Sequence, residues 1–368
     1  MVIGFILDDN LDVADGVQQA VLNNGATLSK MGHEVHYLVC ETERHDVPNI
    51  HSLARSLKMK FNGNSVRTPI RKHRKEINTL LNEINFDVLH VQSPFSPVFA
   101  GYVIRQAHKR GIPVVSTFHI LPYGFVSRVG MRLLRAVFRP YFSKISASVA
   151  VSQPAADFME QSLKVTSTVV PNPVDHTFFN SVKRTKASDK IELVYVGRFD
   201  ERKGVKQLAQ AISNLDSEVL ESIHVTMCGK GPLHQEVSDY IQANNLPVDL
   251  PGFVSDEEKA QYLSNADIAV FPSISGESFG IVLTESMSSN GYVTLGGNNP
   301  GYSSVLHEWP ETLFDPTDMN EFVTTLEKYI TDERLREEVA KKQKKRAKDY
   351  DNDVVAQQLL KIYRDSRS

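Results

Sequence analysis

The sequence predicts an α/β protein of two doubly wound domains, each built on a parallel β-sheet with helices on both faces. Its 368 residues are too many for one ordinary hydrophobic core, which favours two domains. Short apolar runs alternate with helical patterns, and the alternation starts afresh in the second half. Residues 171–189, between the halves, hold two prolines, a charged stretch and little periodicity. We expect this stretch to link residues 1–170 to residues 190–351.

The first domain is predicted from apolar runs that have the length of strands. Strands are expected at residues 2–7, 34–40, 88–91, 114–118 and 148–151. Residues 16–30 have the pattern of a helix that ends near Gly32. Because the strands are apolar throughout, helices are expected to cover both faces of this sheet.

The second domain repeats the scheme. Strands are expected at residues 193–196, 223–227, 268–271 and 293–295, with helices that begin near Gly204, Pro232, Asp256 and Gly280. Residues 352–368 form a final helix, in which Val355, Leu359, Ile362 and Tyr363 make an apolar stripe. This stripe requires a packing partner.

Charge is distributed unevenly between the halves. Residues 1–175 carry 19 Lys and Arg against 14 Asp and Glu, a net charge of +5. Residues 176–368 carry 22 against 30, a net charge of −8. This asymmetry favours an anionic partner for the first domain.

Apolar runs, the first residues and the cysteines indicate the cellular compartment that we expect for this chain. No apolar run approaches the roughly 18–20 residues that span a bilayer. The first residues lack a basic segment and a small-residue cleavage site, so we expect no signal peptide. Cys40 and Cys228 each follow an apolar run and are expected to be buried, reduced thiols, in keeping with the cytoplasm.

Candidate chemistry follows the strands, because doubly wound sheets bind ligands beyond the carboxyl ends of their strands. The segment GRFDERKG, residues 197–204, places Arg198 and Lys203 in a strand-to-helix turn. Two cations there could oppose the charge of a diphosphate leaving group. The alternative is a pair of solvated surface cations, and Arg202 is expected to be such a solvated neighbour.

Two more segments of the second domain follow strands. In CGKGP, residues 228–232, Gly229 and Gly231 flank Lys230 and would let a ligand approach, although a plain tight turn is the alternative. In GESFGIVLTE, residues 276–285, a helix beginning near Gly280 offers unpaired N–H groups to an anion. Glu277 could accept hydrogen bonds from sugar hydroxyls and Glu285 could reach a ribose. The alternative for Glu285 is a solvated helix face.

The first domain contributes His119, which follows a predicted strand and could bond a sugar hydroxyl or assist a proton transfer. A purely structural histidine is the alternative. Gly16 ends a long loop where a ligand could approach the backbone. No His, Cys, Asp or Glu cluster has metal-ligand spacing, so we expect no metal bound by protein ligands.

Basic residues of the first domain favour an anionic membrane surface. In residues 128–145, apolar residues recur at helical spacing while Arg128, Arg132 and Arg135 lie on another face. A core-packed helix with a solvated basic stripe is an equal alternative. A second cluster consists of Arg71, Lys72, Arg74 and Lys75. We expect no nucleic-acid partner, because stacking aromatics do not interleave with these residues.

In this order, these features resemble the retaining GT-B glycosyltransferases of the glycogen-synthase-like superfamily. The matching positions are Gly16, His119, Arg198 with Lys203, Gly229 with Gly231, and Glu277 with Glu285. The resemblance implies two Rossmann-like domains facing each other across a cleft, with the final helix returning to the first domain. The implied donor site comprises Gly16, Gly197, Gly229, Lys230, Val254, Ser278, Phe279, Gly280, Ile281 and Glu285, beside the catalytic residues His119, Arg198, Lys203 and Glu277.

Within that superfamily, the chain is similar to the bacterial phosphatidylinositol mannosyltransferases. The similarity lies in DVADGVQ, FDVLHVQSP, RPYFSKISASVAVS and GESFGIVL. It implies transfer of mannose from GDP-mannose to an inositol phospholipid, in glycolipid biosynthesis at the inner face of the plasma membrane. The implied acceptor residues are Asp9, Gln18, Asn62, Ser65 and Arg67. The chain departs from the family in its first loop, where Asp15 precedes Gly16 and Asp8 and Asp9 add negative charge.

The expected reaction retains configuration, because no side chain is placed as a covalent nucleophile. The acceptor hydroxyl would attack from the leaving-group side, and an oxygen of the leaving phosphate would take its proton. One alternative is a UDP-sugar-dependent glucosyl- or galactosyltransferase acting on diacylglycerol or a soluble acceptor. An alternative of another class is a non-catalytic module that binds sugar nucleotides.

Overall fold

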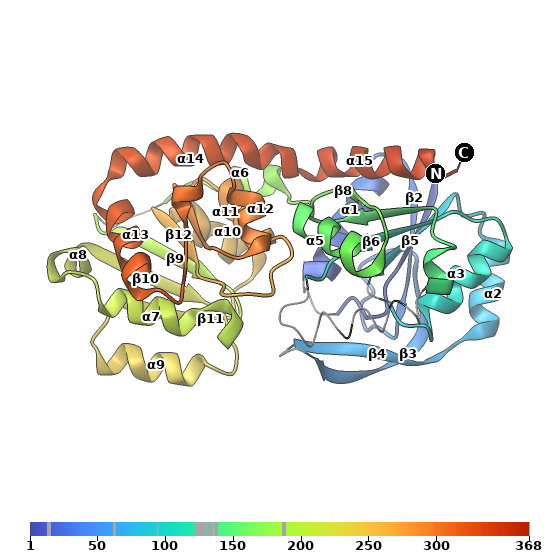
Figure 1. Ribbon diagram of the computed structural model, residues 1–368, viewed down its shortest axis with the longest axis horizontal. Helices are drawn as coiled ribbons and strands as arrows, with labels where there is room; N and C mark the ends of the chain where they lie inside the picture. The colour runs from blue at the N-terminus through green and yellow to red at the C-terminus, as the bar shows by residue number, and fades with distance from the viewer. Residues whose placement is uncertain are drawn as a thin grey trace. The chain divides into compact units, whose positions relative to one another are not determined.

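A computed structural model describes residues 1–12, 16–61, 64–93, 95–121, 130, 135, 139–185 and 189–367, without the side chains of residues 58–61 and 64–67. The chain forms two compact units, Met1–Pro173 with Asn352–Ser368 and Val174–Asp351 (Figure 1). The stretch expected as a linker is not a bare connection. It contains helix α6 (His176–Ser181), which begins where Asp175 accepts a hydrogen bond from the Phe178 N–H.

The first unit contains an eight-stranded sheet with the order β4-β3-β2-β1-β5-β6-β7-β8. Its strands are β1 (Val2–Ile6), β2 (Glu34–Cys40), β3 (Ile50–Phe61), β4 (Asn64–Lys72), β5 (Val88–Ser93), β6 (Val114–Phe118), β7 (Ala147–Ala150) and β8 (Thr168–Val169). Neighbouring strands run parallel except for β3 and β4, which pair antiparallel at the edge. This pair corrects the expectation of a fully parallel sheet. Its apolar residues are interrupted by polar and basic ones, so it lacks the pattern of a buried strand.

The helices of the first unit cover both faces of the sheet. They are α1 (Gly16–Lys30), α2 (Arg74–Glu83), α3 (Ala100–Lys109), α5 (Gln153–Phe158), which continues into a π-helical turn (Met159–Leu163), and α15 (Asn352–Asp365). Successive strand residues point to opposite faces. Val88 of β5 therefore joins the core beneath α1 and α15, whereas Leu89 joins the core beneath α2 and α3.

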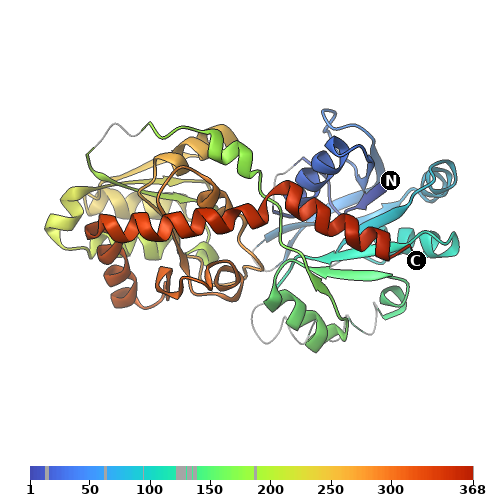
Figure 2. The same ribbon diagram turned by 90° about the horizontal axis from the view of Figure 1, so that it is seen from above.

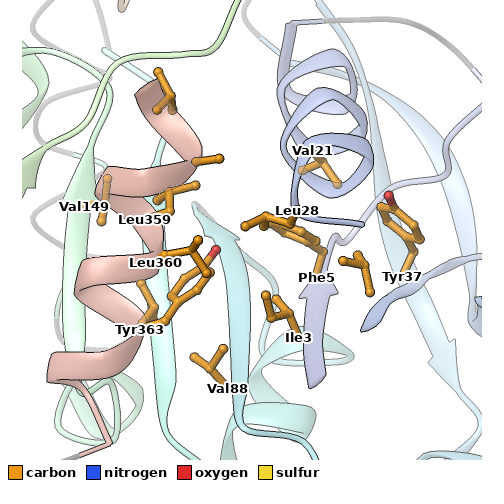
Figure 3. Packing of buried hydrophobic residues seen from close by; sticks show 14 of the residues in the cluster. Ile3, Phe5, Val21, Leu28, Tyr37, Val88, Val149, Leu359, Leu360 and Tyr363 are labelled. Atoms are coloured by element: carbon orange, nitrogen blue, oxygen red, sulfur yellow. The ribbon is translucent and has the colours of Figure 1, made fainter. Parts of the chain in front are cut away.

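Helix α15 is held on the sheet by its apolar stripe. Leu359, Leu360 and Tyr363 are buried against β1, β5 and β7 residues, which include Ile3, Val88 and Val149 (Figure 3). Figure 2 shows α15 lying along the first unit's sheet. At its far end the Tyr363 hydroxyl lies 2.6 Å from His90 Nδ1 of β5.

The second unit has a six-stranded parallel sheet with the order β11-β10-β9-β12-β13-β14. Its strands are β9 (Ile191–Val196), β10 (Ile223–Cys228), β11 (Val248–Gly252), β12 (Ile268–Phe271), β13 (Val293–Gly297) and β14 (Leu313–Phe314). Its helices, besides α6, are α7 (Val205–Ser213), α8 (Ser217–Ser222), α9 (His234–Ala243), α10 (Asp256–Asn265), α11 (Ile281–Ser288), α12 (Pro300–Leu306), α13 (Met319–Thr331) and α14 (Glu333–Ala347). Both units thus have the predicted α/β architecture of flanked, predominantly parallel sheets.

Helix starts in the second unit are fixed by local side-chain caps. Ser255 and Glu258 form a reciprocal capping box at α10. Asn299 caps α12 and Asp318 caps α13 through acceptor oxygens facing the first turn. These polar residues satisfy N–H groups that have no partner within their own helix.

The packing of α15 gives the first testable prediction. Replacing Leu359 with Ala removes a fully buried side chain, and we expect the free energy of unfolding to fall by about 2–5 kcal/mol. Gln358→Ala, at an exposed position of the same helix, should change it by less than about 0.5 kcal/mol. Urea denaturation of both variants measures the difference. Equal stabilities would show that α15 is not part of the core.

Candidate functional site at the carboxyl ends of the strands

The second unit gathers its candidate residues at the switch point of its sheet. Strands β9 and β12 are neighbours there, and the chain order reverses between them. The loop after β9 holds GRFDERKG, and the loop after β12 holds Glu277. The two loops are joined by a backbone hydrogen bond of 2.8 Å from the Ile274 N–H to the Arg202 carbonyl.

Glu277 is the centre of a buried cluster of charges. Its Oε1 accepts hydrogen bonds from Arg202 Nη1 (2.6 Å), Lys203 Nζ (2.8 Å) and Ser273 Oγ (2.8 Å). The Glu277 side chain is only 12% exposed. Burial alone would raise its pKa, but Lys203 and Arg202 outweigh that effect and hold the pKa below its ordinary value. Glu277 is therefore a carboxylate at neutral pH.

Arg202 is not the solvated neighbour that the sequence suggested. Its side chain is 17% exposed and ion-pairs with Glu277. Arg202 is directed to Glu277 by the 3₁₀ turn Glu201–Lys203. Asp200 caps the start of this turn and accepts a hydrogen bond from the Lys203 N–H. Arg202 and Lys203 both reach Glu277 from this turn.

Arg198 stands apart from this cluster. Its side chain is 44% exposed, and its Nε lies 3.8 Å from the Asp200 carboxylate. Within the described part of the chain, no hydrogen bond or ion pair joins Arg198 to Glu277. The structure therefore joins Lys203 with Glu277, while Arg198 stays on the same loop with its cation open to solvent.

The turn after β10 comes close to the loop after β9. The Gly197 N–H donates to the Cys228 carbonyl at 3.0 Å, and the Phe199 N–H donates to the Lys230 carbonyl at 3.1 Å. Gly229 has a φ of +145°, and a Cβ there would collide with the Gly197 carbonyl oxygen. Only glycine fits this close approach of two backbones.

The end of β11 lies against the same turn. The Gly229 N–H donates to the Gly252 carbonyl at 2.7 Å. Val254, two residues further on, is half-buried, and Phe253 between them is 79% exposed. Lys230 and Val254 are therefore on neighbouring loops at one edge of the sheet.

Helix α11 begins directly after the Glu277 loop. Gly280 has a φ of +109°, and Ser278 precedes the buried Phe279, whose ring packs edge-on against Tyr350. The first N–H groups of α11, beginning at Ile281, lie at the positive end of the helix dipole, which favours an anion.

Glu285 lies on α11 but not on a solvated face. It is buried, and Lys259 Nζ donates to its Oε1 at 2.8 Å. Burial lowers the pKa of Lys259, but Glu285 outweighs burial and raises it above its ordinary value. The alternative of a solvated helix face for Glu285 is therefore wrong.

In the first unit, polar residues replace the apolar core where β5 and β6 end. His90 and Gln92 continue the face that begins with Val88, and Thr117 and His119 continue the face of Val115. His90 Nε2 lies 2.7 Å from Thr117 Oγ1, and His119 Nε2 lies 2.7 Å from Gln92 Oε1. Burial lowers the pKa of His119 to about 4, so His119 is neutral at pH 7.

Asp8 ties the first loop of this unit to the start of α3. Its carboxylate accepts hydrogen bonds from the backbone N–H groups of Ser96 and Ala100. Burial raises the pKa of Asp8 to about 6, against the lowering effect of these hydrogen bonds. Asp8 therefore has a structural role. This role explains one of the two acidic residues, Asp8 and Asp9, that precede Gly16 in the first loop.

The structure describes some of the predicted acceptor residues with their side chains and others only in part or not at all. Asp9 Oδ1 accepts a hydrogen bond from the Asn10 N–H, Gln18 is buried in α1, and Gly16 is the first residue of that helix. Ser65 and Arg67 belong to β4 by their backbone, with side chains that are not described. Asn62 lies outside the described residues.

The structure likewise describes only some of the predicted membrane-binding residues. Arg71 and Lys72 end β4, Arg74 and Lys75 begin α2, and all but Lys72 are exposed. Arg135 is half-buried, whereas Arg128 and Arg132 lie outside the described residues. Among the described helices, none combines the length and apolar character needed to cross a bilayer. The described residues also contain no group of three or more His, Cys, Asp or Glu that could hold a metal.

Comparison with known protein families agrees with this geometry. Residues 177–346 match the family "Glycosyl transferases group 1", and residues 14–178 match "Glycosyltransferase Family 4". The two matches together span residues 14–346, well over half of the chain. The chain belongs to the GT-B glycosyltransferases.

This glycosyltransferase is similar over its whole length to named relatives. It is 28% identical over 372 residues to "Phosphatidyl-myo-inositol mannosyltransferase" of Mycolicibacterium smegmatis, covering 99% of this chain and 93% of the relative. Among solved structures, a glycosyltransferase from Rickettsia africae has a TM-score of 0.77 at 15% identity, covering 99% of this chain and 98% of that one. Anabaena HepE in complex with UDP and glucose has a TM-score of 0.73 at 16% identity, covering 99% and 100%.

Sequence reasoning missed three residues that contact candidate residues. Arg202 and Lys259 do so in the second unit, and Gln92 does so in the first unit. The alternation of Gln92 with His90 in a buried strand could have indicated that its side chain shares a face with core residues. The partners of Arg202 and Lys259 come from distant segments, so no local pattern indicated them.

The charge cluster predicts a pH-dependent loss of stability in Glu277→Gln. Removing the carboxylate leaves two poorly hydrated cations, and we expect the free energy of unfolding at pH 7 to fall by about 3 kcal/mol. Because the pKa of Glu277 is lowered by folding, its contribution is present above the unfolded value of 4.5 and is lost as pH falls through the folded value. The difference from wild type should therefore shrink in acid.

Glu236→Gln provides the control. Glu236 also pairs with a lysine of this unit, Lys206 at 3.1 Å, but its side chain is 60% exposed. We expect its removal to cost less than about 1 kcal/mol. Chemical denaturation from pH 7 down to about pH 3 measures both variants, and equal effects would contradict a buried role for the Glu277 cluster.

Proposed function

We propose that this glycosyltransferase transfers a hexose, with retained configuration, from a nucleotide-diphosphate sugar to a lipid acceptor. The favoured donor is GDP-mannose and the favoured acceptor is phosphatidylinositol. The observation that carries the proposal is the convergence of Lys203 and Glu277 next to the start of α11, at the switch point of the second unit's sheet. Full-length similarity to relatives named phosphatidyl-myo-inositol mannosyltransferase supports mannose as the sugar and phosphatidylinositol as the acceptor.

The donor diphosphate would lie against Lys203, Arg198 and the first N–H groups of α11. Arg198 is solvent-accessible, and its charge is opposed by Asp200 only at 3.8 Å. A helix N-terminus flanked by cations is suited to a diphosphate and to the charge that builds on it as it leaves. Glu277 would stand beside the sugar and accept hydrogen bonds from its hydroxyl groups.

The reaction would follow a same-face route. The acceptor oxygen forms a bond to the anomeric carbon as the bond from that carbon to the donor's phosphate oxygen breaks. A leaving-phosphate oxygen takes the acceptor's proton. The state of Glu277 supports this route over covalent catalysis, because three hydrogen bonds and a lowered pKa make its carboxylate a weak nucleophile.

The first unit would serve the acceptor and the membrane. His119 and the residues around Gly16 would face the reacting sugar and acceptor. The exposed side chains of Arg71, Arg74 and Lys75 would attract anionic lipids, which supports the proposal of a peripheral enzyme at the inner face of the plasma membrane.

A second candidate is transfer from a UDP-sugar to diacylglycerol or a soluble acceptor. Two structures of similar fold support this alternative, because both contain UDP, one with glucose and one with GlcNAc. Both candidates use the same cations, so they differ only in base, sugar and acceptor.

A donor and acceptor panel tests the proposal and the role of its cations together. Radiolabelled GDP-mannose with phosphatidylinositol vesicles should give a labelled lipid, and UDP-sugars should not. Lys203→Ala and Arg198→Ala should each lower turnover by roughly 10²–10³-fold, as removal of oxyanion donors does. Lys206→Ala, which removes a half-buried lysine that pairs with Glu201 and Glu236 in the same unit, should leave turnover unchanged.

The panel also separates the remaining alternatives. Transfer from UDP-sugars alone would favour the second candidate. Donor binding without hydrolysis or transfer to any acceptor would favour a non-catalytic module. Wild-type turnover in both cation variants would remove Arg198 and Lys203 from the active site.

A further inference from the structure

Arg202 is attached to the loop after β12 by its backbone as well as by its side chain. Its carbonyl oxygen accepts hydrogen bonds from the Ile274 N–H at 2.8 Å and from Ser273 Oγ at 3.2 Å. Its Nη1 donates to Glu277 Oε1 at 2.6 Å and, more weakly, to the Ser275 carbonyl at 3.5 Å. The backbone and the guanidinium of Arg202 are therefore both held by this loop.

The turn that carries Arg202 also packs directly on the backbone after β12. The turn ends at Gly204, whose φ is +69°. A Cβ on Gly204 would collide with the Pro272 carbonyl oxygen, so only glycine allows this close approach. Because the backbone around Arg202 is held in this way, a change of its side chain alone should leave the loop in place.

Lys203 is attached to the cluster by a single contact. Its Nζ donates to Glu277 Oε1 at 2.8 Å, and among the described residues its ammonium has no other hydrogen-bond partner. An ammonium has three protons on a flexible four-carbon stem, so Lys203 can turn to another acceptor by giving up only this bond. A guanidinium is planar and rigid, which suits a lasting pair with a carboxylate.

The two cations share one oxygen of Glu277, so a diphosphate beside Lys203 would compete with that oxygen for the ammonium. If Lys203 were the only cation at Glu277, the competition would leave a buried carboxylate without a counter-charge, which is strongly unfavourable. We propose that Arg202 is the lasting partner of Glu277, a positioning residue that holds the carboxylate in place when a donor diphosphate draws Lys203 away. This inference rests on the proposed function and deepens it.

The groups around the cluster offer Glu277 no further cation among the described residues. Tyr195 of β9 and Tyr302 of α12 are buried, and burial raises the pKa of both phenols well above their ordinary value, so both are neutral. Asp200, which caps the turn, is itself acidic. The charge of the carboxylate is therefore compensated by the two cations that reach its Oε1.

The charge of Glu277 can be followed in the complete protein without an assay of activity. Glutamate labelled with ¹³C at Cδ gives a signal that moves as the carboxyl group titrates, and the Glu277 signal is identified by its loss in Glu277→Gln. In wild type we expect a pKa below the ordinary value of 4.5. Arg202→Met should raise this pKa by roughly 1–3, because one of two opposing charges is lost. Arg202→Lys, which restores a cation, should reverse most of the rise.

Binding of GDP tests the division of roles between the two cations. In Arg202→Met, GDP must draw Lys203 from a carboxylate that has no other cation. We therefore expect the affinity for GDP, measured by calorimetry at pH 7, to fall roughly 10–100-fold. The double variant Arg202→Met/Glu277→Gln removes the competing carboxylate and should recover the lost affinity. A double variant that binds GDP as weakly as Arg202→Met would show that Arg202 contacts the diphosphate itself, and would overturn the proposal.

The wild-type protein provides a test that does not depend on the folding of any Arg202 variant. Saturating GDP should leave the ¹³C signal of Glu277 at its ionised position at pH 7, because Arg202 remains as its partner. Uptake of a proton by Glu277 in the GDP complex would contradict the proposal. So would a pKa of Glu277 that is the same in wild type and Arg202→Met, or one that is as high in Arg202→Lys as in Arg202→Met.

Arg184→Met is the matched control. Arg184 Nη2 lies 2.6 Å from Asp267 Oδ1, and this pair is also largely removed from solvent. Asp267 directly precedes β12, at the end of the strand opposite to the Glu277 loop. Its loss should leave the pKa of Glu277 and the affinity for GDP unchanged. Changes as large as those in Arg202→Met would mean that any lost ion pair of this unit has the same effect, and the specific role of Arg202 would be wrong.

The two proposals fail in different ways. If wild type binds neither GDP nor UDP, the proposed function fails, and the inference about Arg202 fails with it. If a nucleotide sugar supports transfer and Arg202→Met binds the nucleotide with wild-type affinity, the proposed function stands and the positioning role of Arg202 is wrong.

Discussion

The Glu277 carboxylate is the constraint on which the candidate donor site depends. One oxygen takes hydrogen bonds from a guanidinium, an ammonium and a hydroxyl, and these come from loops that follow two neighbouring strands. Without this carboxylate, only solvent would separate the cations of Arg202 and Lys203. Joined by Glu277, the loops hold Lys203 close to the start of α11. A site that is ordered before its substrate arrives spends less binding free energy on ordering itself.

The first unit also holds buried polar side chains in place at the ends of its strands, but with neutral groups in place of charged ones. Its core face is apolar for most of the length of β5 and β6 and becomes polar only where the strands end. His90 faces Thr117 there and Gln92 faces His119, so the burial of these four side chains is compatible with a fixed arrangement. Tyr363 of α15 is part of this arrangement through His90. The same helix therefore closes the core and contacts the polar network that holds His119.

The main sheet strands and the helices at 16–30, 256–265 and 352–365 could be predicted because their apolar periodicity is local. The β3–β4 pair could not, because its residues mix basic, polar and apolar types and its pairing is set by an edge of the sheet. The candidate site residues also divide into those with a local sequence pattern and those whose contacts depend on distant segments. His119, Lys203 and Glu277 were indicated by their places after predicted strands, whereas the Arg202–Glu277 and Lys259–Glu285 pairs join residues far apart in sequence. Which charge is buried depends on such tertiary partners, so a sequence pattern alone assigned Arg202 to solvent and left a solvated helix face open as the alternative for Glu285.

The most direct test of this account is a crystal structure of the protein with GDP bound. The diphosphate should lie within hydrogen-bonding distance of Lys203 and Arg198, beside the first N–H groups of α11, with Glu277 still in contact with Arg202. A diphosphate bound elsewhere, with the Glu277 cluster intact and unoccupied, would contradict the assignment of this cluster to the donor.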